Sequence, residues 1–508
     1  MGKRHLMLLL VAAMVLTAFA GCSTGPAPSG PSGEEPKETE LVIAIKADVS
    51  TLHPSDHRTT SEIDVETQIY DTLYKVSREG KTPEPRLATS YEIGSDGMTY
   101  TFHLREDATF HDGTPVKASD VVFSAKLYEQ SIYQNATVAG MESVEATDDY
   151  TVVFKTSSVY TPFLESIMGM HVASEAYYNS VDDETFAMRP LGSGPYKFVD
   201  REVGNKIVLE AYEDYYLGEA PIKKVIYRVI PDDTTIAVGL QTGEIDFAEI
   251  AESSYATLEG KEGVTIDKFN MSRFGFISVN HEKYPFSEVK FRQAIAYAID
   301  REKMVEVALD GFGTVNSNIL SPLRFGYSED QPKYTYDPER AKELLRECGI
   351  ETPYDLGVMY ISEAFSTQAQ LVQSDLEAIG LNTTIEILEA NAYYAKLMGG
   401  ECGISVLAMT LEGNTQEYSL AFLPQYIGGA NNARYKNDQV TQWFEDAVKA
   451  VDEDERFEIY DKIFTKVQED AVYIVLYNSI GLYAYNSNLQ CHEFELEGAY
   501  HVREFSWK

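Results

Sequence analysis

The sequence predicts an α/β protein with more than one lobe. Short apolar runs typical of strands, at 41–45, 223–230 and 276–280, alternate with longer segments whose apolar residues recur every three or four positions, as in amphipathic helices. A chain of 508 residues is also too long for one compact core. We therefore expect at least two lobes, each of which mixes strands and helices.

The first residues predict export and attachment to a membrane. A charged start precedes an apolar run at 6–19, which has the length of a signal-peptide core and is too short to span a bilayer permanently. The run leads to Ala-Gly before Cys22, which resembles a lipobox, although Phe19 stands where a leucine is usual. We expect 1–21 to be a lipoprotein signal peptide and Cys22 to carry the lipid. The alternative is an ordinary secretory signal that ends near a cysteine.

Composition indicates how the remainder of the chain is presented. Residues 22–40 are rich in Ser, Gly, Pro, Thr and Glu without an apolar period, so we expect a flexible tether. The formal net charge of −38 argues against binding to nucleic acid and against direct adsorption to anionic lipid. The body should therefore be held at a membrane by lipid on Cys22 alone.

The expected elements follow one another along the chain. After the strand at 41–45, a loop at 48–56 leads to a helix through 63–70, and Gly243 and Gly380 are expected to end two later helices. The further helices that apolar spacing and end signals predict are 234–242, 337–348, 367–379, 439–451 and 453–469, and the last two strands are 472–476 and 482–485.

The segment 87–126 carries the most information about identity. It reads LATSYEIGSDGMTYTFHLREDATFHDGTPVKASDVVFSAK, an alternating strand between two Asp-Gly turns, followed by a helix. Related blocks are LGSGPYKF from Leu191, LQTGEID from Leu240, and VKFRQAIAYAIDREK from Val289. Together these motifs closely resemble the family 5 extracellular solute-binding proteins, which are the peptide and nickel receptors of ABC importers.

The resemblance covers the chain from about Leu41 onward and implies a particular architecture. It is a two-lobed periplasmic-binding-protein-like fold of type II, with a discontinuous first lobe and an extra subdomain. The first lobe would take 41–275 plus 483–508 and include a subdomain near 63–190, and the second lobe would take 276–482. A ligand bound between the lobes can favour closure only through its greater affinity for the closed state.

Catalytic and metal motifs are missing from the sequence. It contains no Gly-x-Ser-x-Gly, His-Glu-x-x-His, Cys-x-x-Cys or nucleotide-loop pattern, so we expect neither an enzyme nor a cofactor. His53 and His57 are four residues apart, but Pro54 between them favours a loop, so no metal site is predicted. His111, in a turn, is interpreted as structural and as bonded to local backbone.

Peptide receptors of this family hold the amino group of the ligand with an Asp that follows a Trp late in the second lobe. The resemblance places Glu412 at the position of that Asp and Met409 at the position of the Trp. A carboxylate facing an ammonium group is a strong charge-assisted contact, so Glu412 can keep the role. Glu412 can equally be a solvated loop residue, and Asn414 can orient a ligand amide or simply shape the loop.

Four further residues are candidates for ligand binding. His57 and Arg58 lie in a first-lobe loop that often lines the cleft of this family, and Arg58 could hold a carboxylate or lie on the surface. Arg273 stands at a predicted hinge, where a salt bridge is favoured slightly over a contact with ligand. His171 follows Met-Gly-Met and is the weakest candidate.

The expected function is capture of a short peptide by a monomeric, lipid-anchored receptor that delivers it to an ABC permease and its ATPases. The same role for a nickel chelate, an opine or an oligosaccharide is the alternative within this class. A sensor lipoprotein or a surface enzyme is the alternative from another class.

Overall fold

This computed structural model describes residues 39–75, 83–322, 324–410, 415–492, 494 and 498–508. None of the helices in these residues has the length and hydropathy that crossing a membrane requires. The expected signal peptide, the lipid site at Cys22 and the candidates Glu412 and Asn414 lie outside the described residues.

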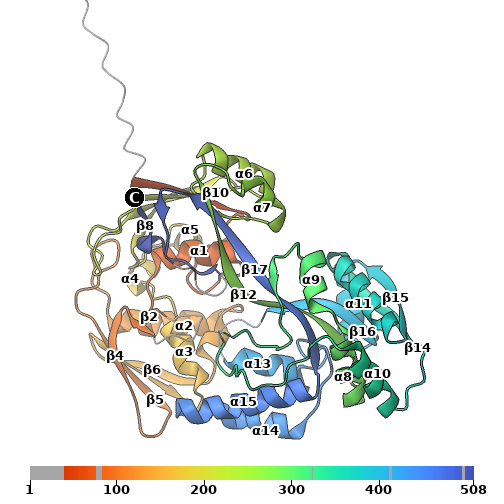
Figure 1. Ribbon diagram of the computed structural model, residues 1–508. Coiled ribbons are helices and arrows are strands. Elements are labelled where there is room, and N and C mark those ends of the chain that lie inside the picture. Colours follow the sequence, from red (N-terminus) through yellow and green to blue (C-terminus); the bar gives the residue numbers. More distant parts are fainter. Residues whose placement is uncertain (1–38, 76–82, 323, 411–414, 493, 495–497) are drawn as a thin grey trace, which may run out of the picture. The chain divides into compact units, whose positions relative to one another are not determined.

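A mixed sheet organises the described chain (Figure 1). Its strands pair antiparallel, except that β1 is parallel to β10 and β11, and β14 is parallel to β15 and β16. Its 11 strands, in sheet order, are β15 (Leu381–Leu388), β14 (Tyr354–Ser362), β16 (Ile404–Thr410), β12 (Val264–Val279), β17 (Tyr473–Asn486), β11 (Phe247–Glu249), β1 (Glu40–Ile45), β10 (Lys224–Val229), β9 (Lys206–Ala211) and β8 (Tyr196–Glu202), with β13 (Gly313–Thr314) paired to β17.

β12 and β17 are the two long strands at the centre of this sheet. They pair antiparallel along most of their length, from Val264 opposite Asn486 to Ser278 opposite Tyr473, and Figure 1 shows them as two adjacent diagonal ribbons. The register shifts between Asn270 and Phe274, which marks a bulge. The prediction of short strands at 276–280, 472–476 and 482–485 was wrong in extent, because the ladder continues through residues without an alternating apolar pattern.

A smaller sheet of four strands lies in the segment between β1 and β8. Its order is β4-β5-β7-β6, and the motif at 87–126 supplies two of these strands and the helix α2 that follows them. The strands are β4 (Ala88–Ile93), β5 (Thr99–Leu104), β6 (Met141–Asp148) and β7 (Thr151–Thr156). Two-stranded ribbons are formed by β2 (Tyr74–Lys75) with β3 (Glu84–Pro85) and by β18 (Leu489–Gln490) with β19 (Ser506–Trp507).

The helices follow the predicted pattern closely, and Gly243 and Gly380 adopt the positive φ angles expected after helix ends. Those before β12 are α1 (Thr60–Ile69), α2 (Ala118–Gln130), α3 (Pro162–Met168), α4 (Glu175–Tyr178), α5 (Asp183–Met188), α6 (Asp233–Thr242) and α7 (Glu252–Leu258). Those after it are α8 (Val289–Ala298), α9 (Arg301–Ala308), α10 (Pro338–Glu347), α11 (Ser366–Ala378), α12 (Ala390–Met398), α13 (Thr415–Phe422), α14 (Asp438–Ala447) and α15 (Glu453–Glu469).

The buried apolar residues form separate clusters, and β12 and β17 connect them. Phe269 on β12 belongs to a cluster built around β1, α1 and the C-terminal residues, whereas Phe274 belongs to one whose members all fall between 274 and 477. On β17, Tyr477 belongs to the cluster between 274 and 477, whereas Tyr483 belongs to the cluster of Phe269 and Leu482 to a smaller cluster that includes residues of α6. A further cluster, from 73–172, lies under the four-stranded sheet. The two long strands therefore pass from one core to another.

The Gly-Ser-Gly block at 192–194 fixes the end of α1. A Cβ atom at Gly192 would overlap the carbonyl oxygen of Ile69, and the Gly194 amide donates to that oxygen at 2.8 Å. His111 holds the block from the other side, because its Nε2 lies 3.0 Å from the Gly194 carbonyl oxygen and the Gly192 amide donates to its Nδ1 at 3.3 Å. His111 is thus structural, but its partners are far along the chain rather than local.

Three cysteines fall within the described residues. Cys348, Cys402 and Cys491 are all free thiols, so no disulfide bridge is formed among these three. Burial raises the pKa of Cys402 to about 11 and that of Cys491 to about 12.

The His111 contacts predict a pH-dependent loss of stability. Burial lowers the pKa of His111 from 6.5 to about 4, so the folded protein binds fewer protons at this site than the unfolded chain. This contribution to stability is present above pH 6.5 and is lost as the pH falls toward 4. For His111→Gln, we expect the decrease in unfolding free energy over this range to be smaller than in wild type by about 2–3 kcal/mol.

Urea unfolding at several pH values between 4 and 7 measures this difference. His103→Gln is the control, because it removes a histidine from β5 and leaves His111 and its two glycine partners in place. An identical pH slope in wild type and His111→Gln would contradict the prediction.

Candidate functional site

Two cavities in the described residues are candidates for binding. The first, of about 290 Å³, lies beside α1, β2 and the C-terminal residues and includes His57 and His171 in its lining. The second, of about 430 Å³, lies at the end of β16, in the part of the chain whose core falls between 274 and 477.

The first cavity depends on how α1 begins. Thr59 is the N-cap residue, and Glu62 completes a capping box by accepting from the Thr59 amide. The Glu62 carboxylate also accepts hydrogen bonds from the amides of Ser50 at 3.1 Å and Arg58 at 2.7 Å. Burial raises the pKa of Glu62, but these hydrogen bonds outweigh that effect and lower it overall. The loop before α1 is therefore held against the first turn of the helix.

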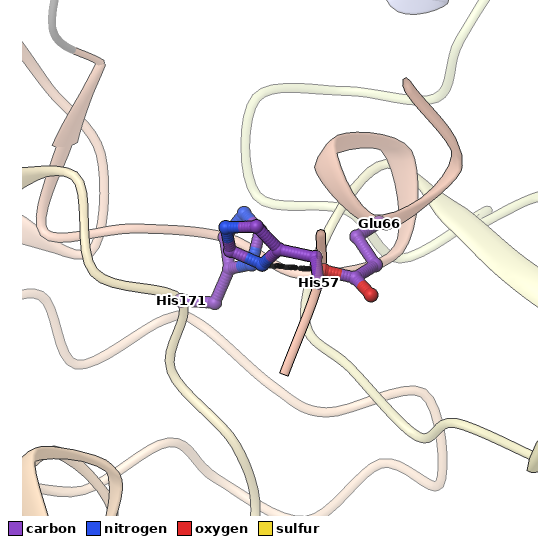
Figure 2. A group of neighbouring side chains, drawn as sticks. All are labelled: His57, Glu66 and His171. Atoms are coloured by element: carbon purple, nitrogen blue, oxygen red, sulfur yellow. Dashed lines mark ion pairs between the residues drawn. The ribbon is translucent and has the colours of Figure 1, made fainter. Parts of the chain in front are cut away.

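Glu66 lies one turn after Glu62, so the two carboxylates share the buried face of α1. The Glu66 side chain is 0% exposed, and Nδ1 of His57 lies 3.0 Å from its Oε2. Nδ1 of His171 lies 3.8 Å from the same oxygen. Figure 2 shows both rings beside the Glu66 carboxylate, with ion pairs as dashed lines. We call these three residues the His–Glu–His cluster.

Burial controls the charges in this cluster. It raises the pKa of Glu66 to about 7, although His57 acts in the opposite direction. It lowers the pKa of His171 to about 3, and the nearby His57 lowers it further, while a hydrogen bond to the backbone at Pro54 opposes both. The Tyr70 ring stacks on His171 with the centroids 5.7 Å apart.

The lining of the first cavity includes a second polar group, around Asp71. Asp71 is buried there and accepts hydrogen bonds from the hydroxyls of Tyr215, at 2.9 Å, and Tyr216. Burial raises the pKa of Asp71, and the two tyrosine hydroxyls act against that rise. Lys75, Arg86 and Arg503 add positive charge to the lining. The lining of the first cavity thus includes the two histidines of the His–Glu–His cluster and side chains of both charges.

The second cavity is largely apolar and lies close to the predicted ligand contacts. Leu407, Met409 and Thr410 line it from β16, immediately before 411–414. The side-chain amide of Asn432 is oriented by a hydrogen bond that its Oδ1 accepts from the Ser278 hydroxyl at 2.7 Å. The rest of the lining comes from α12, α13 and the following loop: Tyr394, Met398, Leu420, Ala421, Gly429 and Ala430, together with Ala408 of β16.

The other predicted residues are placed separately. Arg58 is exposed, and its guanidinium carbon lies 4.5 Å from the centre of the Tyr133 ring. Arg273 is exposed on β12, opposite Thr410 of β16, and the salt bridge favoured there is not formed with any residue that the structure describes. The structure therefore brings together the side chains of His57 and His171, whereas Arg58 contacts the Tyr133 ring and Arg273 pairs with Thr410 across the sheet.

Sequence reasoning missed Glu66. The available signal was the spacing of Glu62 and Glu66, which places two acids on the same face of the helix as Val65 and Ile69. An acidic pair on a buried face needs partners, and the structure supplies backbone amides to the first and two histidines to the second.

Comparisons with known proteins agree with this fold. Residues 82–426 match the family model described as bacterial extracellular solute-binding proteins, family 5 middle. Heme-binding protein A of Haemophilus influenzae is 30% identical over 453 residues, which cover 82% of each chain. The oligopeptide-binding protein AppA of Bacillus subtilis is 28% identical and covers 96% of this chain and 95% of its own. The solved structure of HbpA2 from Haemophilus parasuis superposes with a TM-score of 0.84 at 25% identity, covering 92% of this chain and 100% of that one.

Proposed function

Because the chain belongs to the bacterial extracellular solute-binding proteins of family 5, we propose that it is a receptor that captures a short peptide and delivers it to an ABC permease. The family consists of receptors, and this chain has their two-lobed α/β fold. The observation that carries the peptide assignment is the apolar cavity at the end of β16, which adjoins the segment expected to hold the amino group of a peptide.

The proposal places the ligand between two lobes. The first lobe takes 41–275 and 483–508, and the second takes 276–482. The change of core within β12 and β17 supports this division, since both strands leave one apolar cluster and enter another near the bulge. Closure of the lobes on a peptide would bury the cavity at β16, and main-chain hydrogen bonds would leave the side chains of the peptide largely unspecified.

We also propose that lipid on Cys22 attaches the receptor to the outer face of the cell membrane, through the tether at 22–40. The motif before Cys22 and the composition of the tether support this part of the proposal.

Filling the cavity at β16 should weaken peptide binding. Ala408 lines the cavity, so Ala408→Phe places a ring in the space where we propose that the peptide binds. We expect the affinity for di- to hexapeptides to fall more than about tenfold, as overpacking and lost contacts each cost about 1–3 kcal/mol. Intrinsic tyrosine fluorescence and the ligand-induced rise in melting temperature measure binding.

The matched control is Ala392→Phe, which places the same ring on an exposed position of α12 outside the cavity. Peptide binding by the control should equal that of wild type. If wild type binds no peptide but hemin changes its absorption spectrum, the ligand is heme, the class named for the Haemophilus influenzae relative. The peptide proposal is then overturned.

Glu412 should recognise the amino group of the peptide. Glu412→Gln removes the negative charge, so the affinity for a peptide with a free amino terminus should fall roughly 10–100-fold, the value of a charge-assisted hydrogen bond. An N-acetylated peptide of the same sequence should bind wild type and variant equally. Calorimetric titration of both peptides gives the comparison, and the exposed Glu386→Gln is the control. Equal losses for both peptides would refute the role of Glu412.

Lipid attachment at Cys22 has its own test. Cys22→Ala removes the thiol that would carry the lipid, so we expect the variant to leave the membrane fraction and appear in the soluble extracytoplasmic fraction. Fractionation followed by immunoblotting measures this change. Wild type that is already found in the soluble fraction would support an ordinary secretory signal, and a variant that stays with the membrane would show that another feature attaches the protein.

A further inference from the structure

The His–Glu–His cluster leaves buried polar atoms without hydrogen bonds. Both carboxylate oxygens of Glu66 and Nδ1 of both histidines are buried and have no aligned hydrogen bond to a described residue. The 3.0 Å contact between His57 and Glu66 is close but does not have the geometry of a hydrogen bond. Buried polar groups in this state are costly unless a further group satisfies them.

The spacing of these atoms fits a metal ion. Ligands at about 2.0 Å from a tetrahedral zinc ion lie about 3.3 Å from each other. Nδ1 of His57 and of His171 lie 3.0 and 3.8 Å from Oε2 of Glu66, on either side of this value. One ligand atom from each of the three residues falls within 4.8 Å of the others, and rotation of one imidazole ring can close the remaining difference.

The surroundings fix the ligands in a suitable orientation. Nδ1 of His171 has no hydrogen-bond partner among the described residues and lies 3.8 Å from Oε2 of Glu66. In the tautomer that carries its proton on Nε2, the lone pair of Nδ1 is available to a metal ion. Stacking on Tyr70 holds the same ring in place.

We propose that His57, Glu66 and His171 form a binding site for a divalent transition-metal ion, of which Zn²⁺ is the representative. The ligands are Nδ1 of both histidines and one oxygen of the carboxylate. Two neutral imidazoles and one carboxylate are a donor set that suits zinc and its neighbours rather than Mg²⁺ or Ca²⁺, which prefer oxygen. The positive ion also neutralises the buried carboxylate of Glu66.

The fourth coordination position faces the first cavity. His57 and His171 are both part of its lining, so an ion can reach the cluster from the cavity, and water can complete the coordination. The site combines His57 with a histidine more than 100 residues later in the chain, and for that reason the sequence did not suggest it. His53, the histidine nearest to His57 in the sequence, contacts Asp56 instead. The site belongs to the first lobe and is separate from the cavity at β16.

Zinc binding by the purified full-length protein, produced without a histidine tag and stripped with chelator, tests the site. Elemental analysis after gel filtration should find one zinc per chain in wild type. Glu66→Gln and His171→Gln should each weaken zinc binding by more than about 100-fold, since even residues that only orient a ligand are worth about 10–100-fold. Glu66→Gln has almost the shape of the original side chain, so its effect is separable from unfolding, which circular dichroism monitors.

The nature of the ligands gives a second readout. X-ray absorption of the zinc-loaded protein should show nitrogen and oxygen neighbours near 2.0 Å, with the scattering pattern of two imidazoles. His103→Gln, outside the cluster, should bind zinc as wild type does. Wild type that retains no zinc, or a Glu66→Gln/His171→Gln double variant that binds zinc unchanged, would overturn the proposal and leave the cluster as a buried contact between histidine and glutamate. Ala408→Phe should keep its zinc, so this result is independent of peptide binding.

Discussion

The pairing of β12 with β17 is the constraint on which the rest of the structure depends. These strands run antiparallel and contribute buried residues to two apolar cores, so they connect one core to the other. Glycine makes this pairing possible at close range. A Cβ at Gly481 would overlap the Phe269 ring, and one at Gly275 would overlap Tyr477. Each aromatic ring therefore lies across the opposing strand, and the two main chains remain in register on both sides of the bulge.

Much of the fold could be predicted from the sequence, and the errors have physical causes. α15 runs over the predicted residues because Asp452 caps it and the apolar period continues to its end. The central strands were predicted too short, because the ladder continues on both sides of the bulge between Asn270 and Phe274, and its main-chain pairing does not require an alternating apolar pattern. Local patterns report the burial of side chains and carry little information about the pairing of strands far apart in the chain.

The candidate site was predictable only in part. His57 and His171 were identified one by one, from a loop position and from a neighbouring motif, but nothing in the sequence indicated that they meet. Their meeting depends on α1, whose capped start holds the loop at 50–58, and on the glycine block that fixes its end. Glu66 is the residue that connects them, and it is carried by an element whose position is decided by tertiary packing.

The free cysteines have a consequence for how the described part of the chain folds. Because burial raises the pKa of Cys402 and Cys491 well above neutrality, few of these thiols are in the reactive thiolate form. Burial also raises the pKa of Cys348. Without bridges among these three cysteines, the described fold owes nothing to oxidation, and it should be equally stable under reducing and oxidising conditions. A receptor of this kind can fold outside the cell without enzymes that form or rearrange disulfides.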